Sequence, residues 1–184
     1  MSPGEMKLEP DRAALLVIDI QERLCAAMDR DRLDRLMNRT VAAIRGARAL
    51  GIPIIATEQY PRGLGPTASL VKAELGAEKP VEKIEFSAMV NEVTRRLKGR
   101  KQVLVTGMET HVCVFQTVRH LPIYASQAFL CADAVLSRNE VDHRIGIDLC
   151  KEAGAVITTV EAALFDLLGK AGTPEFKAIS NAVR

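Results

Sequence analysis

The stretch "AALLVIDI", residues 13–20, decides how this chain is expected to fold, because Asp19 alone interrupts its apolar run. A continuous apolar run of this length is typical of a strand that is buried on both faces of a parallel sheet. The following "DRLDRLMNRTVAAIRGARAL", residues 31–50, instead places apolar side chains at helical spacing, and Gly51 follows as its C-terminal cap. A buried strand followed by an amphipathic helix indicates an α/β unit.

The same alternation of strand and helix continues along the chain. We expect further strands at residues 52–57, 80–84, 101–108, 128–135 and 155–160. We expect the other helices at residues 67–75, at 87–99, from 110, at 137–153, at 161–168 and from 173. The loop at 58–66 contains no strong element. These elements predict an α/β fold, namely a single-domain three-layer αβα structure with a six-stranded parallel sheet, Rossmann-like, over residues 1–184.

Several short signals place the ends of these helices. Ser87 and the Ser-x-x-Glu spacing of Ser137 and Glu140 each predict a helix start. Thr173 is expected to cap the last helix, with a proline at its first position. Pro122 should end or kink the helix that begins near residue 110 about two turns after Cys113.

Composition excludes several classes of function. The chain has 184 residues, 48% of them hydrophobic and only 4% aromatic, with a net charge of +2 and no run of basic residues. This composition predicts no nucleic-acid partner and no binding to a membrane. Cys25, Cys113, Cys131 and Cys150 lack metal-finger spacing, and the N-terminal segment lacks the apolar core of a signal peptide. We therefore expect free thiols in a soluble, cytoplasmic protein.

Polar residues at the ends of the predicted strands are the candidates for a site. In open parallel sheets, ligands bind beyond the carboxyl ends of the strands, near the point where strand order reverses. Asp19 ends the first strand, Lys83 ends the third, and Cys113 follows the fourth in the first turn of a helix. We therefore expect these three side chains to converge on one edge of the sheet.

These three residue types suit nucleophilic catalysis at an acyl carbon. A helix start and a nearby ammonium are both expected to lower the pKa of the Cys113 thiol. Asp19 can take the thiol proton and return it to a leaving group, and backbone N–H groups around residues 109–113 can hold the oxyanion. His111 is not expected to be the base, because residues two apart on a helix point in different directions.

"LLVIDIQ", "KIEFSA" and "GMETHVCVFQTV" resemble the three signature regions of the isochorismatase-like cysteine hydrolase superfamily. "TEQYPRGLG" and the tail "TPEFKAI" are most similar to the isochorismatase domain-containing protein branch. The resemblance covers nearly the whole chain. It implies a six-stranded parallel sheet, an Asp–Lys–Cys triad at Asp19, Lys83 and Cys113, and a non-proline cis peptide at Met108–Glu109. It also implies an oxyanion hole made by the N–H groups of Glu109 and Cys113.

Departures from the family pattern narrow the expected activity. Members that hydrolyse nicotinamide carry an Asp-x-His motif and further histidines that bind a metal, whereas this chain has "TEQYP" in that loop. We therefore expect no metal and no cofactor. Glu109 replaces a small residue common in many relatives. Retention of Cys113 favours a small amide, ureide or ester-like substrate, and thus a hydrolase that acts on a C–N bond. Ether or ester cleavage driven mainly by Asp19 stays open.

Further residues are candidates for binding the substrate. Gln21 either lines the pocket or bonds the backbone near its strand end, and Gln59 and Tyr60 either contact substrate from the loop or order it. Phe86 is either core or a platform beside the site.

Two other classes of function compete with the hydrolase. A silent binding or scaffold protein predicts a pocket closed over Cys113 or slow reaction with iodoacetamide. A thiol redox sensor predicts a resolving cysteine nearby, and none is adjacent to Cys113 in the sequence. We also expect a homo-oligomer, because superfamily members are often oligomeric. The apolar stretch at 162–176 supplies either the contact surface or a helix packed on its own sheet.

Overall fold

The computed structural model describes residues 6–184, and its centre is a sheet of six parallel strands in the order β3-β2-β1-β4-β5-β6. The strands are β1 (Ala13–Ile18), β2 (Ile54–Gln59), β3 (Val81–Lys83), β4 (Gln102–Met108), β5 (Gln127–Leu136) and β6 (Val156–Thr158). Every residue of β1 and β4 is buried, as expected for strands covered on both faces. The predicted parallel sheet is therefore confirmed.

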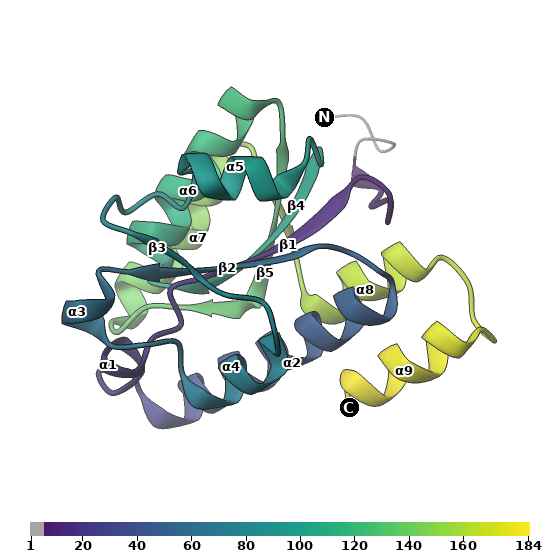
Figure 1. Ribbon diagram of the computed structural model, residues 1–184, viewed down its shortest axis with the longest axis horizontal. Helices are drawn as coiled ribbons and strands as arrows, with labels where there is room; N and C mark the ends of the chain where they lie inside the picture. The colour runs from purple at the N-terminus through teal and green to yellow at the C-terminus, as the bar shows by residue number, and fades with distance from the viewer. Residues whose placement is uncertain (1–5) are drawn as a thin grey trace.

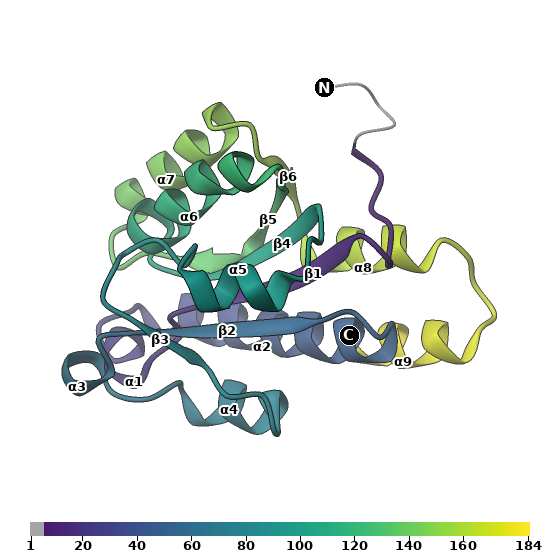
Figure 2. The same cartoon turned by 45° about the horizontal axis from the view of Figure 1, so that its top comes forward.

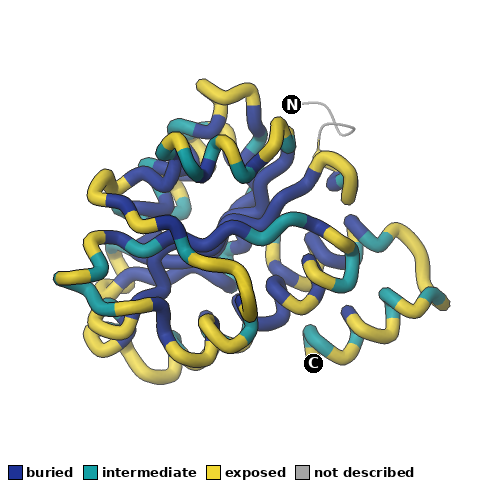
Figure 3. The backbone as a smooth tube through the Cα atoms, in the orientation of Figure 1, coloured by how far each residue is buried: buried dark blue, intermediate teal, exposed yellow. Residues whose placement is uncertain are grey.

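Helices form a layer on each face of the sheet (Figures 1 and 2). One layer holds α2 (Arg30–Ala49), α4 (Ser69–Leu75), α8 (Val160–Leu168) and α9 (Pro174–Ala182). The other holds α5 (Asn91–Leu97), α6 (Phe115–His120) and α7 (Glu140–Glu152). Two apolar clusters separate these layers from the sheet, and Figure 3 shows the buried strands between exposed helix faces. The three-layer αβα architecture is confirmed.

Four short elements join the strands and the longer helices, and all but the one that precedes β5 follow the carboxyl end of a strand. They are the one-turn helices α1 (Glu22–Cys25) and α3 (Pro61–Leu64), the π-helix η2 (Thr110–Val114) and the 3-10 helix η3 (Leu121–Tyr124). The loop predicted to contain no strong element thus holds only the one-turn α3. Helix α6 ends at His120 before Pro122, as predicted. Within residues 6–184, none of the helices combines the length and the apolar character needed to cross a bilayer.

Two of the predicted helix starts are wrong. α5 begins at Asn91 rather than Ser87, whose hydroxyl accepts from the Met89 N–H 3.2 Å away and bonds His120 instead. α7 begins at Glu140 with Asn139 before it, and the Ser137 hydroxyl lies 3.0 Å from His111 Nδ1. In both places a tertiary partner takes the hydroxyl that was expected to cap the helix.

The start of α9 follows the prediction. Thr173 caps this helix by accepting the Phe176 N–H at 3.1 Å. The α8 helix buries Val160, Ala163, Leu164 and Leu167 against the sheet, and Phe165 meets Phe176 of α9 edge to face. Within the chain, α8 of this apolar stretch packs on the sheet and α9 packs on α2 and α8.

Candidate active site

The carboxyl ends of β1, β3 and β4 bring the predicted polar residues together. Strand order reverses between β1 and β4, where β1 leads back to β2 and β3 while β4 leads on to β5 and β6. Asp19 directly follows β1, Lys83 is the last residue of β3, and Cys113 lies in η2 just after β4. The expected convergence of the three residues on one edge of the sheet is present.

Asp19 and Lys83 form an ion pair without access to solvent. Lys83 Nζ lies 2.6 Å from Asp19 Oδ2, and both side chains are 0% exposed. Thr57 Oγ1 donates to the second carboxylate oxygen, Oδ1, at 2.7 Å. The backbone of Asp19 has a φ of 51°, which lies in the left-handed region that residues other than glycine rarely adopt. Strained backbone of this kind persists only where surrounding contacts hold it, and it is concentrated at functional sites.

Lys83 has more acceptors than its three protons can serve. Besides Asp19, its ammonium lies 2.8 Å from Gln59 Oε1 and 3.1 Å from each of the carbonyls of Glu85 and Phe86. A buried ion pair is tolerated only when further hydrogen bonds satisfy both partners, and this one meets that condition. The same bonds hold the backbone of residues 85 and 86 close to the site.

The environment of Cys113 corrects the prediction of a lowered thiol pKa. Burial is the largest effect and the Asp19 charge the next, and together they raise the pKa of Cys113 to about 12. The Lys83 charge acts in the opposite direction but is outweighed by burial and by the Asp19 charge. The residue is 6% exposed. At neutral pH the Cys113 side chain is therefore a protonated thiol.

The chain around the nucleophile candidate has an unusual local geometry. The Met108–Glu109 peptide bond is cis, as the family resemblance implied. The segment then forms η2, in which the N–H groups of Val112 and Val114 donate to the Glu109 carbonyl at 3.0 and 3.2 Å. Single π-helical turns inside helices occur frequently at functional sites. The predicted helix from residue 110 thus begins as a π turn and continues as α6.

The side chain of Glu109 has a partner that sequence reasoning missed. Its Oε1 accepts both the backbone N–H of Arg138, at 3.1 Å, and the Arg138 Nε–H, at 2.9 Å. Glu109 is 6% exposed, whereas the Arg138 side chain is 56% exposed. This ion pair ties the start of the nucleophile segment to the turn before α7. No sequence signal links two residues that lie 29 positions apart.

Two histidine bonds join the nucleophile segment, residues 109–114, to its neighbours: His111 contacts the β5–α7 connection, and His143 reaches the segment from α7. His111 Nδ1 lies 3.0 Å from Ser137 Oγ, and His143 Nδ1 lies 3.0 Å from Thr110 Oγ1. A Cβ added to Gly146 of α7 would lie 2.7 Å from the His111 backbone nitrogen. The helix and the nucleophile segment are therefore in direct contact.

Gln21 and Gln59 form a hydrogen-bonded pair beneath the site. The Gln21 amide donates to the carbonyls of Gln59 and Gly65, at 3.0 and 2.7 Å, and its oxygen accepts the Gln59 N–H at 2.7 Å. The Gln59 amide donates to the Ile84 carbonyl at 2.8 Å while its oxygen accepts from Lys83. Of the alternatives for Gln21, bonding to the backbone is the one observed, and the Gln59 side chain holds Lys83 in place.

Tyr60 and Phe86 lie at the surface beside the site. They are 55% and 52% exposed, so Phe86 is not part of the core, and nearby Ile84 is 76% exposed. A cavity of about 420 Å³ is lined by Tyr60, Pro61, Arg62, Glu82, Lys83, Ile84 and Glu85. Among the described residues, no group of three His, Cys, Asp or Glu is arranged to hold a metal ion.

Comparisons with known proteins place the chain, by its sequence and overall fold, in a family. The family model described as "Isochorismatase domain" matches residues 13–162. The secreted isochorismatase effector Isc1 of Phytophthora sojae is 35% identical over 97% of this chain and 87% of its own length. Isochorismatase domain-containing protein 2 of Bos taurus is 34% identical over 99% and 88%. The solved MAR1 ribonuclease of Caenorhabditis elegans superposes with a TM-score of 0.90 at 33% identity, over 96% of this chain and 92% of its own.

Proposed function

The chain belongs to the isochorismatase family of hydrolases, and from this membership we propose that it is a cysteine hydrolase without a metal cofactor. Its resemblance to the isochorismatase domain-containing branch is confirmed. We assign a small amide, ureide or related acyl compound as its substrate, cleaved through a thioester on Cys113. The observation that supports this most is the buried Asp19–Lys83 ion pair, whose carboxylate is near enough to Cys113 to raise the pKa of its thiol.

In the proposed first step, Cys113 Sγ attacks the substrate carbonyl carbon while its proton passes to Asp19. Because the thiol is protonated at rest, it loses its proton in the same step in which it attacks, and no thiolate is formed beforehand. The carbonyl oxygen becomes an oxyanion, which the N–H groups of Glu109 and Cys113 hold. Lys83 keeps Asp19 in place throughout and balances its charge when it is ionised.

Collapse of this intermediate breaks the C–N bond, and the leaving amine takes the proton from Asp19. Water then gives a proton to the same carboxylate and attacks the thioester carbon. The second intermediate expels Cys113, which regains its proton from Asp19. Each proton that Asp19 accepts is thus returned, and the enzyme ends in its starting state.

We assign substrate contact to Tyr60 and Phe86, since both are exposed beside the site. Gln21 and Gln59 act as positioning residues, because their amides are engaged with the backbone and with Lys83. Cys113 is 6% exposed, and we propose that substrate approaches its sulfur past residues 84–86, where Ile84 and Phe86 are 76% and 52% exposed.

The function is tested by screening small amides, ureides and esters, together with vinyl ethers and RNA, against wild type. RNA is included because the C. elegans relative is named a ribonuclease. Cys113→Ala should abolish turnover of amides and ureides, and Cys113→Ser should retain little of it. A covalent adduct at Cys113 should be seen by intact mass. Cys150→Ala, which removes another buried thiol, is the matched control and should keep its activity.

Full turnover by Cys113→Ala would contradict the thioester route and would favour cleavage driven by Asp19. Absence of turnover and of adducts for all substrate classes would favour the binding or scaffold protein. The redox-sensor alternative is disfavoured by the raised pKa of Cys113, because peroxides react with thiolates.

We further propose that residues 1–184 are a single hydrolase domain that acts in the cytoplasm as a homo-oligomer. An apolar stripe on α7 supports the assembly, since Val141, Ile145 and Leu149 are 57%, 47% and 38% exposed and share one face of the helix. Light scattering of Ile145→Glu against wild type tests this part of the proposal. Equal molar masses for Ile145→Glu and wild type would show that α7 is not the contact surface.

A further inference from the structure

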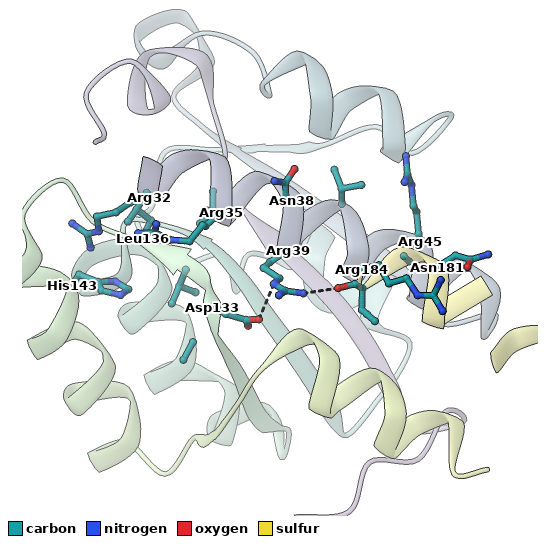
Figure 4. A pocket seen from close by; sticks show the side chains of 16 residues that line it. Arg32, Arg35, Asn38, Arg39, Arg45, Asp133, Leu136, His143, Asn181 and Arg184 are labelled. Carbon is teal, nitrogen blue, oxygen red and sulfur yellow. Dashed lines mark hydrogen bonds and ion pairs between the residues drawn. The ribbon is translucent and has the colours of Figure 1, made fainter. Parts of the chain in front are cut away.

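A second cavity, of about 740 Å³, lies between α2 and the edge of β5. β6 pairs with β5 only at Phe129, Leu130 and Cys131, so the later residues of β5 have no strand beside them on this side. The cavity is formed there, and Figure 4 shows the arginine side chains that line it. We call it the arginine groove; its basic residues from α2 are Arg32, Arg35, Arg39 and Arg45. The lining of the arginine groove includes none of Asp19, Lys83 and Cys113.

The arginines of the groove differ in how they are paired. Arg39 Nε lies 3.6 Å from Asp133 Oδ2, and Arg39 Nη1 donates to the Val183 carbonyl at 3.0 Å. Arg45 binds Glu74, which lies outside the groove. Among residues 6–184, Arg32 and Arg35 have no carboxylate within ion-pair distance. Two guanidinium groups thus remain available beside a third that is held in position.

Positive charge in the groove is compensated only in part, since five arginines, including Arg184, line it together with one Asp. Over the described part of the chain, Asp133 is the one acidic side chain in the lining, and it also accepts the Val160 N–H at 2.9 Å. His143 faces the same space, and its pKa is lowered by burial and by the Arg32 charge. The groove therefore presents a field that favours an anion.

The arrangement of the cations indicates which kind of anion fits. Arg32, Arg35 and Arg39 lie on one face of α2, and the first and last are separated by about 10 Å along the helix axis. Guanidinium groups bind phosphate oxygens bidentately, and a row of them suits several phosphates in sequence better than one. In the described chain, the lining holds no Phe, Tyr or Trp on which a base could stack.

We propose that the arginine groove binds an elongated polyphosphate, either inorganic or the phosphate chain of a nucleotide. The binding site is separate from the proposed active site. Its closest link to that site is His143, which lines the groove and hydrogen-bonds Thr110 at the start of η2.

Calorimetric titration with sodium tripolyphosphate tests this inference, with ATP and orthophosphate as parallel arms. At about 0.15 M salt, where exposed charges are largely screened, wild type should bind tripolyphosphate more tightly than orthophosphate. Arg32→Gln with Arg35→Gln should raise the Kd on the order of tenfold or more. Arg30→Gln with Arg144→Gln removes the same charge outside the groove and should leave the Kd unchanged.

Equal affinity for ATP and tripolyphosphate would identify the phosphate chain as the recognised group, and tighter binding of ATP would identify a nucleotide. Asn38→Glu, which adds a carboxylate at an exposed groove position, should weaken binding even if the arginine double variant folds poorly. An equal loss of tripolyphosphate affinity in both double variants would overturn the proposal. So would a wild type that binds none of tripolyphosphate, ATP and orthophosphate. Binding of single-stranded RNA but not of tripolyphosphate would overturn it as well.

Discussion

Asp19 interacts with two side chains of the site, those of Lys83 and Cys113. Lys83 Nζ lies 2.6 Å from its Oδ2, and its negative charge also raises the pKa of the Cys113 thiol. In the proposed mechanism this carboxylate accepts the thiol proton, while the Lys83 ammonium at hydrogen-bond distance balances its charge. The pair thus provides a base in a place where an isolated carboxylate would be too costly to bury.

Asp19→Asn should have opposite effects on the thiol and on turnover. Loss of the carboxylate charge lowers the pKa of Cys113, and Lys83, no longer neutralised, lowers it further. We expect iodoacetamide to modify Cys113 on the order of tenfold faster or more at pH 8, while turnover falls by roughly 10²-fold or more. Peptide mapping by mass spectrometry measures the modification at each cysteine.

Thr57→Val is the matched control, because it removes the hydrogen bond to Asp19 Oδ1 but keeps the carboxylate charge. Its alkylation rate should remain near that of wild type. If Asp19→Asn is alkylated no faster than wild type, the assigned charge relation is wrong. Slow alkylation of wild type alone does not favour a scaffold protein, because the raised pKa of Cys113 already predicts it.

At the scale of elements, the contact between α7 and η2 sets the position of the nucleophile. Three hydrogen bonds join η2 and the residue before it to α7 and the turn before α7: Glu109 to Arg138, His111 to Ser137 and Thr110 to His143. A glycine, Gly146, lets the two backbones approach, since an added Cβ would lie 2.7 to 2.9 Å from backbone atoms of residues 110 and 111. The backbone of η2 cannot give way without displacing Cys113.

Gly146→Ala should therefore destabilise the protein and reduce turnover. Alanine favours a helix by about 1 kcal/mol, but overpacking against backbone costs about 1–3 kcal/mol. We expect a small net loss of unfolding free energy by urea denaturation and a fall in turnover of roughly tenfold or more, because the sulfur is displaced.

Gly46→Ala serves as its control, since the new Cβ would meet the side chain of Leu164 in the other helical layer. It should lose stability but keep the turnover of its folded fraction. Unchanged turnover in Gly146→Ala would mean that α7 does not set the position of Cys113.

At the scale of the whole molecule, His143 couples stability to pH. Burial first, and the Arg32 charge second, lower the pKa of His143 below its ordinary value. The unfolded chain then binds a proton at His143 more readily than the folded chain does. The contribution of neutral His143 to the free energy of unfolding is therefore fully present above about pH 6.5 and is lost as pH falls further. The free energy of unfolding of wild type should therefore decrease between about pH 7.5 and 5.

Urea denaturation of His143→Gln at the two pH values should show a smaller decrease than that of wild type. Arg32→Gln should give an intermediate result, because it removes the lesser cause and leaves burial in place. An equal pH dependence in all three proteins would show that His143 does not contribute.

Local pattern was enough to predict the sheet and most of its helices. The burial of β1 on both faces, the cap at Thr173 and the end of α6 before Pro122 all depend on neighbours along the chain. The rule that sites lie beyond the strand ends then predicted that Asp19, Lys83 and Cys113 would lie together. The sequence by itself determined the architecture and this shared edge.

Tertiary structure decided what those residues experience. Ser87 and Ser137 cap no helix because His120 and His111 take their hydroxyls, and the pKa of Cys113 is raised because burial and Asp19 outweigh Lys83. The Glu109–Arg138 pair and the arginine groove likewise join segments that are distant in the chain. Hydrogen-bond competition, desolvation and charge depend on distances in space, which periodicity along a sequence does not encode.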